Sequence, residues 1–168
     1  MKIAVVGSYG VGLTMRVPRM PDAGETLLGG EFSDGPGGKG SNQAIGAARL
    51  GADVSLLTAI GGDAFGRSGQ ELWAREGVDA RKTVIVDDAA TMVGFIVVEP
   101  NGENRIVLAA GALDHLDAAH VESFRPEIAA ADVLVVSMEI PLAAVLAALC
   151  IGREEGTLPL PNPAPAQP

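Results

Sequence analysis

The sequence is short of cysteine, aromatic residues and positive charge. Its single cysteine, Cys150, rules out an intrachain disulfide and a metal site built from cysteines, and its Ala/Leu-rich surroundings predict a small core residue. Aromatic residues make up only 4% of the 168 positions, so a core has to be aliphatic. The formal net charge of -9 argues against nucleic acid or an anionic membrane surface as a partner, because both require a basic face.

Apolar runs long enough to span a membrane are also missing. The chain starts with a short apolar stretch, Ile3 to Val6, which ends at Gly7 and is too short for a signal sequence or a membrane span. We therefore expect a cytoplasmic protein without a membrane partner. Hydrophobic residues nevertheless form 48% of the chain, which is sufficient for one domain with a substantial core.

Apolar runs rich in β-branched residues alternate with helical patterns. The strand-like runs lie at 3–6, 54–60 and 133–136, and the helical patterns lie at 41–50, 65–76, 118–131 and 142–155. Runs that are apolar throughout are typical of strands buried on both faces of a parallel sheet. The alternation predicts an α/β fold in which a parallel sheet is flanked by helices.

Two further regions predict a small antiparallel sheet outside the main one. Short extended stretches occur at Glu25 to Phe32 and at Thr91 to Leu108, and the second is interrupted by Asn101-Gly102, which favours a two-residue hairpin turn. We expect this sheet to form a lid over a ligand. Near the end, a fourth parallel strand is expected, but Pro159 and Pro161 lack the ladder donor and predict that the strand is disrupted.

The densest cluster of small and polar residues runs from Gly35 to Ala44 and leads into a helical pattern. Glycines let backbone amides approach a ligand, and a helix start directs free N–H groups outward. Lys39 and Asn42 add a cationic donor and a bifunctional amide. The pattern predicts a site for a polar or anionic ligand. A glycine-rich turn before a helix is the alternative, and it leaves Lys39 and Asn42 unexplained.

The same glycines allow a nucleotide interpretation. Gly35 to Gly40 matches G-x-G-x-x-G, with Asp53 at about the distance of a ribose-binding acid, which would indicate a dinucleotide-dependent oxidoreductase. The preceding residues 31–34 are not a buried apolar strand, so this alternative is the weaker one. The P-loop pattern does not fit, because Gly40 follows Lys39 where serine or threonine is needed.

Several segments together resemble the ribokinase-like, or PfkB, sugar kinases. The first signature of that family is similar to Gly37-Gly38-Lys39-Gly40-Ser41-Asn42-Gln43-Ala44, followed by Gly51 and by Gly61-Gly62-Asp63-Ala64-Phe65-Gly66. Further similar segments are Pro21 to Thr26, Asn101 to Arg105, Ser137 to Pro141 and Asn162 to Pro165. The similarity follows the family order along the whole chain.

The resemblance implies a ribokinase-like fold and a carbohydrate kinase that moves the γ-phosphoryl group of ATP to a sugar hydroxyl with Mg²⁺. It places sugar contacts at Gly38, Lys39, Asn42 and Glu139. The alternative for Glu139 is an acid that stabilises the start of a helix near Pro141. Asp63 matches the first-half signature, so it is not assigned as the catalytic base.

The chain departs from the family at two glycines. Many ribokinases carry G-S-x-N-x-D after the first strand, and the aspartate holds sugar hydroxyls, whereas Gly10 and Gly12 occupy the two polar positions here. Loss of the carboxylate removes charge-assisted hydrogen bonds, so the ligand is expected to be a sugar or a nucleoside rather than ribose specifically.

Family members are longer, and their second half supplies the ATP pocket and a G-A-G-D segment with the base. No G-x-G-D occurs in this sequence. Residues 1–168 are therefore interpreted as the N-terminal portion of one ribokinase-like domain, with lid strands within 16–34 and 91–109 and with the ATP, Mg²⁺ and catalytic sites outside the chain. We expect it to be inactive alone. The alternative is a non-catalytic fragment that binds a sugar or forms a homodimer through the lid sheet.

Overall fold

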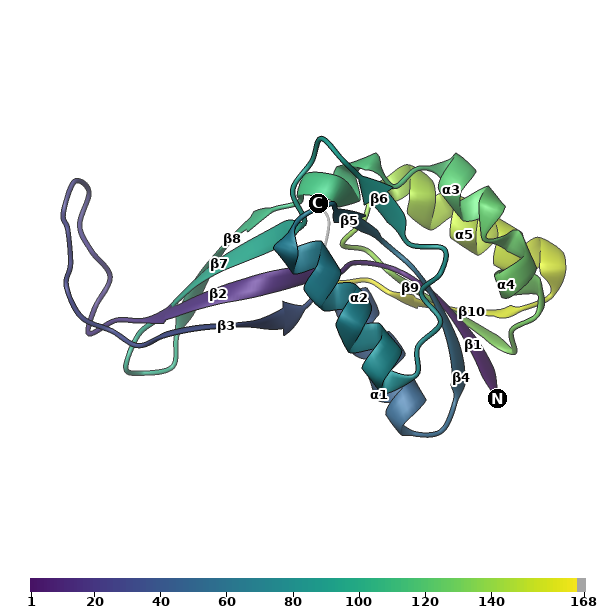
Figure 1. The fold of residues 1–168 in the computed structure, drawn as a ribbon, viewed down its shortest axis with the longest axis horizontal. Coiled ribbons are helices and arrows are strands. Elements are labelled where there is room, and N and C mark those ends of the chain that lie inside the picture. Colours follow the sequence, from purple (N-terminus) through teal and green to yellow (C-terminus); the bar gives the residue numbers. More distant parts are fainter. Residues whose placement is uncertain (166–168) are drawn as a thin grey trace.

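A computed structural model of the chain describes residues 1–165 and has two parts (Figure 1). One part is a parallel sheet with helices on both faces, and the other is a second sheet that projects from it as a long, flat arm. The order of elements alternates strand and helix through the first part, as the sequence predicts.

The main sheet has four parallel strands in the order β10-β9-β1-β4. Their bounds are Lys2–Val6 (β1), Asp53–Leu57 (β4), Val133–Ser137 (β9) and Leu158–Asn162 (β10). The central strand β1 is buried on both faces: Ile3 and Val5 contribute to one core cluster, and Ala4 and Val6 to the other. Continuous apolar sequence is therefore required in this strand.

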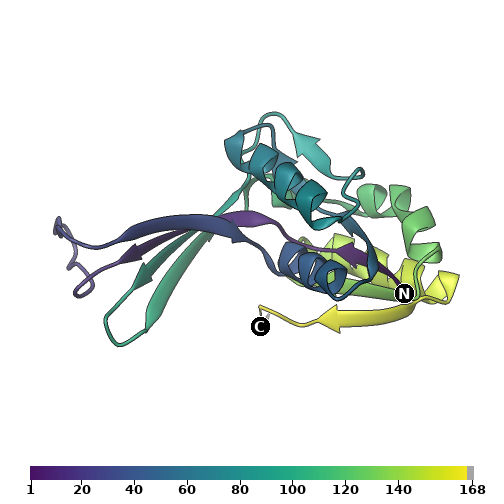
Figure 2. The same cartoon turned by 60° about the horizontal axis from the view of Figure 1, so that its bottom comes forward.

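Helices cover both faces of this sheet (Figure 2). They are α1 (Lys39–Arg49), α2 (Ala64–Glu76), α3 (Ala118–Ser123), α4 (Arg125–Ala129) and α5 (Leu142–Glu155). The helix α1 packs with the Ile3 and Val5 side, whereas α3, α4 and α5 pack with the Ala4 and Val6 side. The single helix expected at 118–131 is two helices that meet at Phe124, because Pro126 lies in the first turn of α4 and cannot continue a helix through that point.

The predicted strand at 54–60 is likewise divided. β4 ends at Leu57, and the chain continues after Thr58 as β5 (Ala59–Gly61), which pairs in parallel with β6 (Val84–Val86) in a separate two-stranded sheet. A short 3₁₀ helix, η1 (Gly111–His115), packs against this small sheet. The sequence from 54 to 60 is apolar throughout except at Ser55 and Thr58, so it does not indicate that the chain pairs with β1 first and with β6 afterwards.

The projecting sheet, called the lid here, has the order β3-β2-β7-β8. Its strands are β2 (Gly10–Arg16), β3 (Phe32–Gly37), β7 (Met92–Val98) and β8 (Asn104–Ala109). The β2–β3 and β7–β8 pairs are antiparallel, and β2 and β7 are parallel. The second pair lies within 91–109 as expected. The range 16–34 is wrong for the first pair, because β2 precedes it and β3 extends to Gly37.

The residues from Glu25 to Glu31, which we expected to be extended strand, form a loop. Gly24, Gly29 and Gly30 have positive φ values of 82°, 106° and 135°, which do not fit a regular strand. The hairpin between β7 and β8 is also longer than predicted. The Glu99 N–H donates to Glu103 O at 2.9 Å, which leaves a three-residue loop, 100–102. The Gly102 N–H donates to Glu99 O at 2.9 Å, and Gly102 has φ 87°, in the left-handed region.

The strand β10 corrects the prediction that Pro159 and Pro161 disrupt the fourth parallel strand. β10 lies at the edge of the sheet and pairs with β9, with Leu158 opposite Val133 (Figure 2). The Leu158 N–H donates to Asp132 O, so alternation turns the backbone nitrogens of Pro159 and Pro161 toward the open edge. No ladder hydrogen bond is lost, because the missing N–H groups are on the unpaired side.

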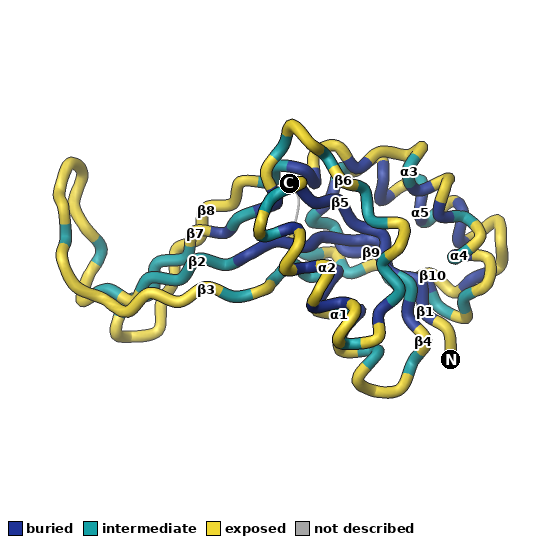
Figure 3. The backbone as a smooth tube through the Cα atoms, in the orientation of Figure 1, coloured by how far each residue is buried: buried dark blue, intermediate teal, exposed yellow. Residues whose placement is uncertain are grey.

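Burial is concentrated in the main sheet, and the outer loops of the lid are exposed (Figure 3). Cys150 is exposed, not a core residue as expected, because Ala148 and Ile151 take the buried positions in that part of α5. Within residues 1–165, none of the helices combines the length and the apolar character needed to span a bilayer.

Candidate functional site

The candidate site forms where the carboxyl ends of β1 and β9 meet the start of α1. The two strands are parallel neighbours, with Val6 opposite Val136, so the segments that follow them emerge side by side. Ser8 follows β1, and Glu139 follows β9. Gly38 is the N-cap of α1, and Lys39 is its first residue.

Glu139 is the centre of the site, and its side chain is only 10% exposed. Its Oε2 accepts hydrogen bonds from Ser8 Oγ at 2.5 Å and from the Lys39 backbone N–H at 2.9 Å. Its Oε1 forms an ion pair with Lys39 Nζ. Lys39 and Glu139, which are 100 residues apart in sequence, thus lie together in the fold.

The surroundings of Glu139 keep its carboxylate charged. Burial raises the pKa of Glu139, but hydrogen bonds from Lys39 and Ser8 outweigh burial, so the pKa lies below the ordinary value of a glutamate. The acid does not lie in the first turn of α5, which begins at Leu142 and has no acidic residue there. Its contacts therefore account for its position better than stabilisation of that helix does.

The start of α1 differs from the prediction of free N–H groups. Lys39 N–H donates to Glu139, Gly40 N–H donates to Ser8 Oγ at 3.4 Å, and Ser41 N–H donates to Ser8 O at 2.9 Å. These three N–H groups are already hydrogen-bonded within the protein and are not free for a ligand. The site consequently offers an ammonium group beside a carboxylate, which suits a neutral ligand with hydroxyl groups better than an anion.

Two glycines at this point are required by close packing. A Cβ on Gly38 would lie 2.6 Å from both Ser8 O and Tyr9 Cα, and Gly38 has φ 90°. A Cβ on Gly40 would lie 2.6 Å from the Gly7 carbonyl carbon. Both glycines therefore let α1 approach the end of β1, and this approach brings Lys39 to Glu139.

Asn42 is exposed one helical turn after Lys39 and on the same face of α1. Among the residues that the structure describes, no hydrogen bond joins its side chain to Ser8, Lys39 or Glu139. The structure thus brings Gly38, Lys39 and Glu139 together and leaves Asn42 outside this contact.

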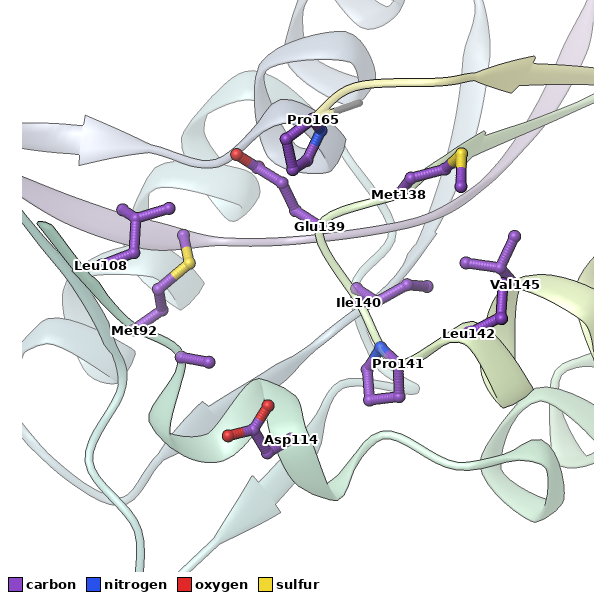
Figure 4. A pocket seen from close by; sticks show the side chains of 11 residues that line it. Met92, Leu108, Asp114, Met138, Glu139, Ile140, Pro141, Leu142, Val145 and Pro165 are labelled. Carbon is purple, nitrogen blue, oxygen red and sulfur yellow. The ribbon is translucent and has the colours of Figure 1, made fainter. Parts of the chain in front are cut away.

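A cavity of about 400 Å³ lies between Glu139 and the lid (Figure 4). Met92 and Leu108 line it from the lid, and Glu139 and Ile140 line it from the loop between β9 and α5. The volume lies in the range of about 300–1,000 Å³ that is usual for small-molecule sites.

Gly12 lies on the face of the lid that closes this cavity. It is opposite Gly94, which is opposite Leu108, and directly opposed residues point to the same face of a sheet. A Cβ on Gly12 would meet only the end of Ile96 at 3.2 Å and Gly35 O at 3.9 Å. By contrast, a Cβ on Gly10 would lie 2.6 Å from Met92 O. Gly12 therefore leaves space for a side chain, and Gly10 does not.

Ser8 was not identified as a site residue from the sequence. It is fully buried and bonds both Glu139 and the start of α1. The Gly-Ser pair after the first strand was the available signal, but its meaning depends on β9 lying beside β1.

The structure does not provide the geometry of a dinucleotide site at Gly35 to Gly40. Gly35 and Gly37 lie within β3, paired antiparallel with β2, and not in a turn after a parallel strand. Among residues 1–165, no group of three or more His, Cys, Asp or Glu side chains is placed to hold a metal ion.

Comparison with known proteins places the chain among sugar kinases. It is 39% identical over 165 residues to a ribokinase of Haemophilus influenzae, covering 98% of this chain and 54% of that protein. It is 41% identical to a ribokinase of Schizosaccharomyces pombe, covering 100% of this chain and 55% of that protein. The chain thus spans about half the length of the curated relatives it matches.

Solved structures give the same result. A ribokinase from Giardia lamblia superposes with a TM-score of 0.89 at 30% identity, covering 99% of this chain and 51% of that one. A ribokinase from Cryptococcus neoformans in complex with ADP gives 0.86 at 34% identity, covering 99% and 52%. The model of the pfkB family carbohydrate kinases matches residues 1–168. The chain therefore belongs to the pfkB family of carbohydrate kinases.

Proposed function

We propose that this chain is the sugar-binding, lid-bearing part of a carbohydrate kinase, and that Gly38, Lys39, Asn42 and Glu139 contact the sugar. The observation that carries the proposal is the contact between Lys39 and Glu139 beneath the lid. A carboxylate has about four acceptor sites and an ammonium group has three donors, so both groups keep capacity after pairing. A sugar hydroxyl donates and accepts at once and uses both.

Phosphoryl transfer from ATP requires parts that these 168 residues do not supply. The sequence contains no G-x-G-D segment, and the curated relatives are about twice as long as the region they share with this chain. We place the ATP site, Mg²⁺ and the catalytic base in a region comparable to the remainder of those relatives. The chain alone binds the sugar and does not catalyse its phosphorylation.

The space at Gly12 bears on which sugar is bound. No carboxylate extends from the lid at this position, and Met92, Ile96 and Leu108 make the neighbouring surface apolar. The two acids that line the cavity, Glu139 and Asp114, both lie outside the lid sheet, so hydroxyl recognition is concentrated away from the lid. This arrangement accepts a pentose, and it leaves room for a nucleoside whose base lies against the lid.

A homodimer through the lid is the second proposal. Phe95 is directly opposite Val107, on the face of the lid that points away from the cavity, and these side chains are 50% and 72% exposed. Phe32, 59% exposed, lies on the same face. Exposed apolar patches of this kind mark interaction surfaces.

The cytoplasmic location and the lack of a nucleic-acid partner stay predictions from the sequence.

The dimer is tested by light scattering. We expect the purified chain to have twice the monomer mass, and a Phe95→Asp, Val107→Asp double variant to be monomeric. Leu50→Asp is the matched control, because Leu50 is 91% exposed but lies at the end of α1, outside the lid. A wild-type chain that is monomeric at micromolar concentration contradicts the dimer.

The main proposal is tested with ATP, Mg²⁺ and ribose. We expect no sugar-dependent formation of ADP by the chain, and an increase in melting temperature with ribose alone, since a ligand that binds only the folded state stabilises it. Turnover by this chain that a Lys39→Ala change abolishes would contradict the assignment of catalysis to residues outside it. No stabilisation by pentoses, hexoses or nucleosides would contradict the sugar site.

A further inference from the structure

Asp63 joins two segments that the proposed function does not otherwise connect. It is the N-cap of α2, and its Oδ1 accepts a hydrogen bond from the Gly66 N–H at 2.8 Å, as a helix cap does. The same carboxylate also accepts from Thr91, 28 residues later, through the backbone N–H at 2.8 Å and the hydroxyl at 2.7 Å. One side chain thus fixes a helix start and the residue before β7.

Thr91 is held at the root of the lid. It is 1% exposed and immediately precedes Met92, the first residue of β7. Its hydroxyl donates to Asp63 and accepts from the Gly61 N–H at 3.0 Å. The backbone N–H and the hydroxyl of Thr91 are therefore both hydrogen-bonded to the segment that contains Gly61 and Asp63.

The chain around Thr91 is packed without free space. A Cβ on Gly61 would collide with Ala89 O, and a Cβ on Gly111 would collide with Ala90 O. Ala90 O also accepts a hydrogen bond from the Ala112 N–H at 2.8 Å. The residues just before β7 and just after β8 are thereby held together, and Asp63 is the charged group that bonds to Thr91 there.

This point adjoins one wall of the cavity beside Glu139. Met92, next to Thr91, lines the cavity with Glu139 and fills the space beside Gly10 of β2. Ala110, next to Gly111, lines the same cavity. Asp63 itself is not among the lining residues, so it acts on a ligand only through the position of the lid.

We propose that Asp63 is a positioning residue of the sugar site, which fixes the root of lid strand β7 to the start of α2 and thereby sets the lid over Lys39 and Glu139. This role rests on the proposed sugar function. Burial raises the pKa of Asp63, but the hydrogen bonds from Gly66 and Thr91 lower it below the ordinary value, so the acceptor stays ionised at neutral pH.

The Asp63→Asn variant separates positioning from helix capping. An amide oxygen in place of Oδ1 still accepts from the Gly66 N–H and the Thr91 hydroxyl. The amide nitrogen then replaces Oδ2 and faces the Thr91 N–H, so two donors oppose each other. Asp117→Asn is the matched control, because Asp117 caps α3 through the His120 N–H at 2.9 Å and contacts no lid residue.

The test measures amide hydrogen exchange and ribose affinity on the 168-residue chain. For Asp63→Asn we expect exchange of β7 and β8 amides to increase by about tenfold or more, because an unpaired buried donor weakens the local structure, and exchange in β1 and β9 to stay unchanged. Ribose affinity is expected to fall by about the same factor. Thr91→Val, which removes only the hydroxyl bonds, is expected to act in the same direction, and Asp117→Asn to match the wild type in both measurements.

Lid amides that exchange at the wild-type rate in both Asp63→Asn and Thr91→Val overturn the proposal. An equal increase in the lid and in the main sheet also overturns it, because it shows a purely structural role. If the wild type binds no pentose, hexose or nucleoside, the sugar function fails, and the exchange measurement still decides whether Asp63 holds the lid.

Discussion

Ser8 Oγ donates a 2.5 Å hydrogen bond to Glu139 Oε2 across 131 residues of sequence. The contact exists because β1 and β9 are parallel neighbours, so the residues just beyond them meet at one edge of the sheet. Ser8 Oγ also accepts from the Gly40 N–H, which links Glu139 to the start of α1. The carboxylate is thus oriented by contacts within the protein.

The first prediction follows from this contact. A Ser8→Ala change removes a donor to Glu139 and an acceptor for Gly40, and we expect it to weaken ribose binding by about tenfold, which corresponds to the loss of about one charge-assisted hydrogen bond. Titration calorimetry measures the affinity. Ser33→Ala is the control, because Ser33 is exposed on the lid. Equal affinity of Ser8→Ala and the wild type would show that the contact does not orient the carboxylate.

The second prediction concerns how the stability of the fold changes at acidic pH. The pKa of Glu139 is lower in the folded chain than in the unfolded chain, so its contribution to the free energy of unfolding is complete above the ordinary pKa, about 4.3, and is lost as the pH falls through the lower folded pKa. Urea denaturation between pH 3 and pH 7 should show that the stability difference between wild type and Glu139→Gln shrinks on acidification. Glu71→Gln, at an exposed position of α2, controls for the loss of one carboxylate. A pH-independent difference would rule out this role for Glu139.

The third prediction uses the only tryptophan. Trp73 is fully buried and its indole N–H donates to Ser41 Oγ at 2.8 Å, which joins α2 to the first turn of α1. Ser41→Ala leaves this N–H unpaired, and we expect a loss of about 1–3 kcal/mol in the free energy of unfolding. Tryptophan fluorescence in urea measures it, with the exposed Ser123→Ala as control. A loss no larger than that of Ser123→Ala would show that another group satisfies the indole.

The fourth prediction tests the edge of the main sheet. Pro159 and Pro161 present no N–H donors to the open side of β10, which prevents another strand from forming a full ladder there. A Pro159→Val, Pro161→Val double variant supplies both donors and should associate beyond the wild-type mass in light scattering. Pro18→Val with Pro21→Val, in an exposed loop, is the control. An unchanged mass would mean that the prolines do not protect this edge.

Much of the main sheet could be predicted because its strands are continuous apolar runs, and the predicted bounds of α5, Leu142 to Glu155, agree with the structure. Strand β2 escaped prediction because Gly10 and Gly12 give it the composition of a loop, and its extended form depends on β3 and β7, which are distant in sequence. Strand β10 escaped for a related reason. Whether a proline breaks a strand depends on which side its nitrogen faces, and sequence does not show that.

The site was predicted in part. Lys39 and Glu139 were identified by resemblance, and their contact is present in the structure. The free amides expected at the start of α1 are instead bonded to Ser8 and Glu139, because Gly38 and Gly40 bring the helix against the end of β1. Close approach of backbone segments is a property of the assembled fold, and a list of glycines indicates only that it is permitted.

The central claim is that Lys39 and Glu139 bind a sugar beneath the lid, and calorimetric titration of the chain without nucleotide tests it most directly. We expect saturable heat with ribose or a nucleoside for the wild type, and a loss of affinity of about tenfold or more in Glu139→Gln and in Lys39→Ala. Lys82→Ala, an exposed lysine outside the site, should bind as the wild type does. No heat with any pentose, hexose or nucleoside, or equal binding by Glu139→Gln, would contradict the account.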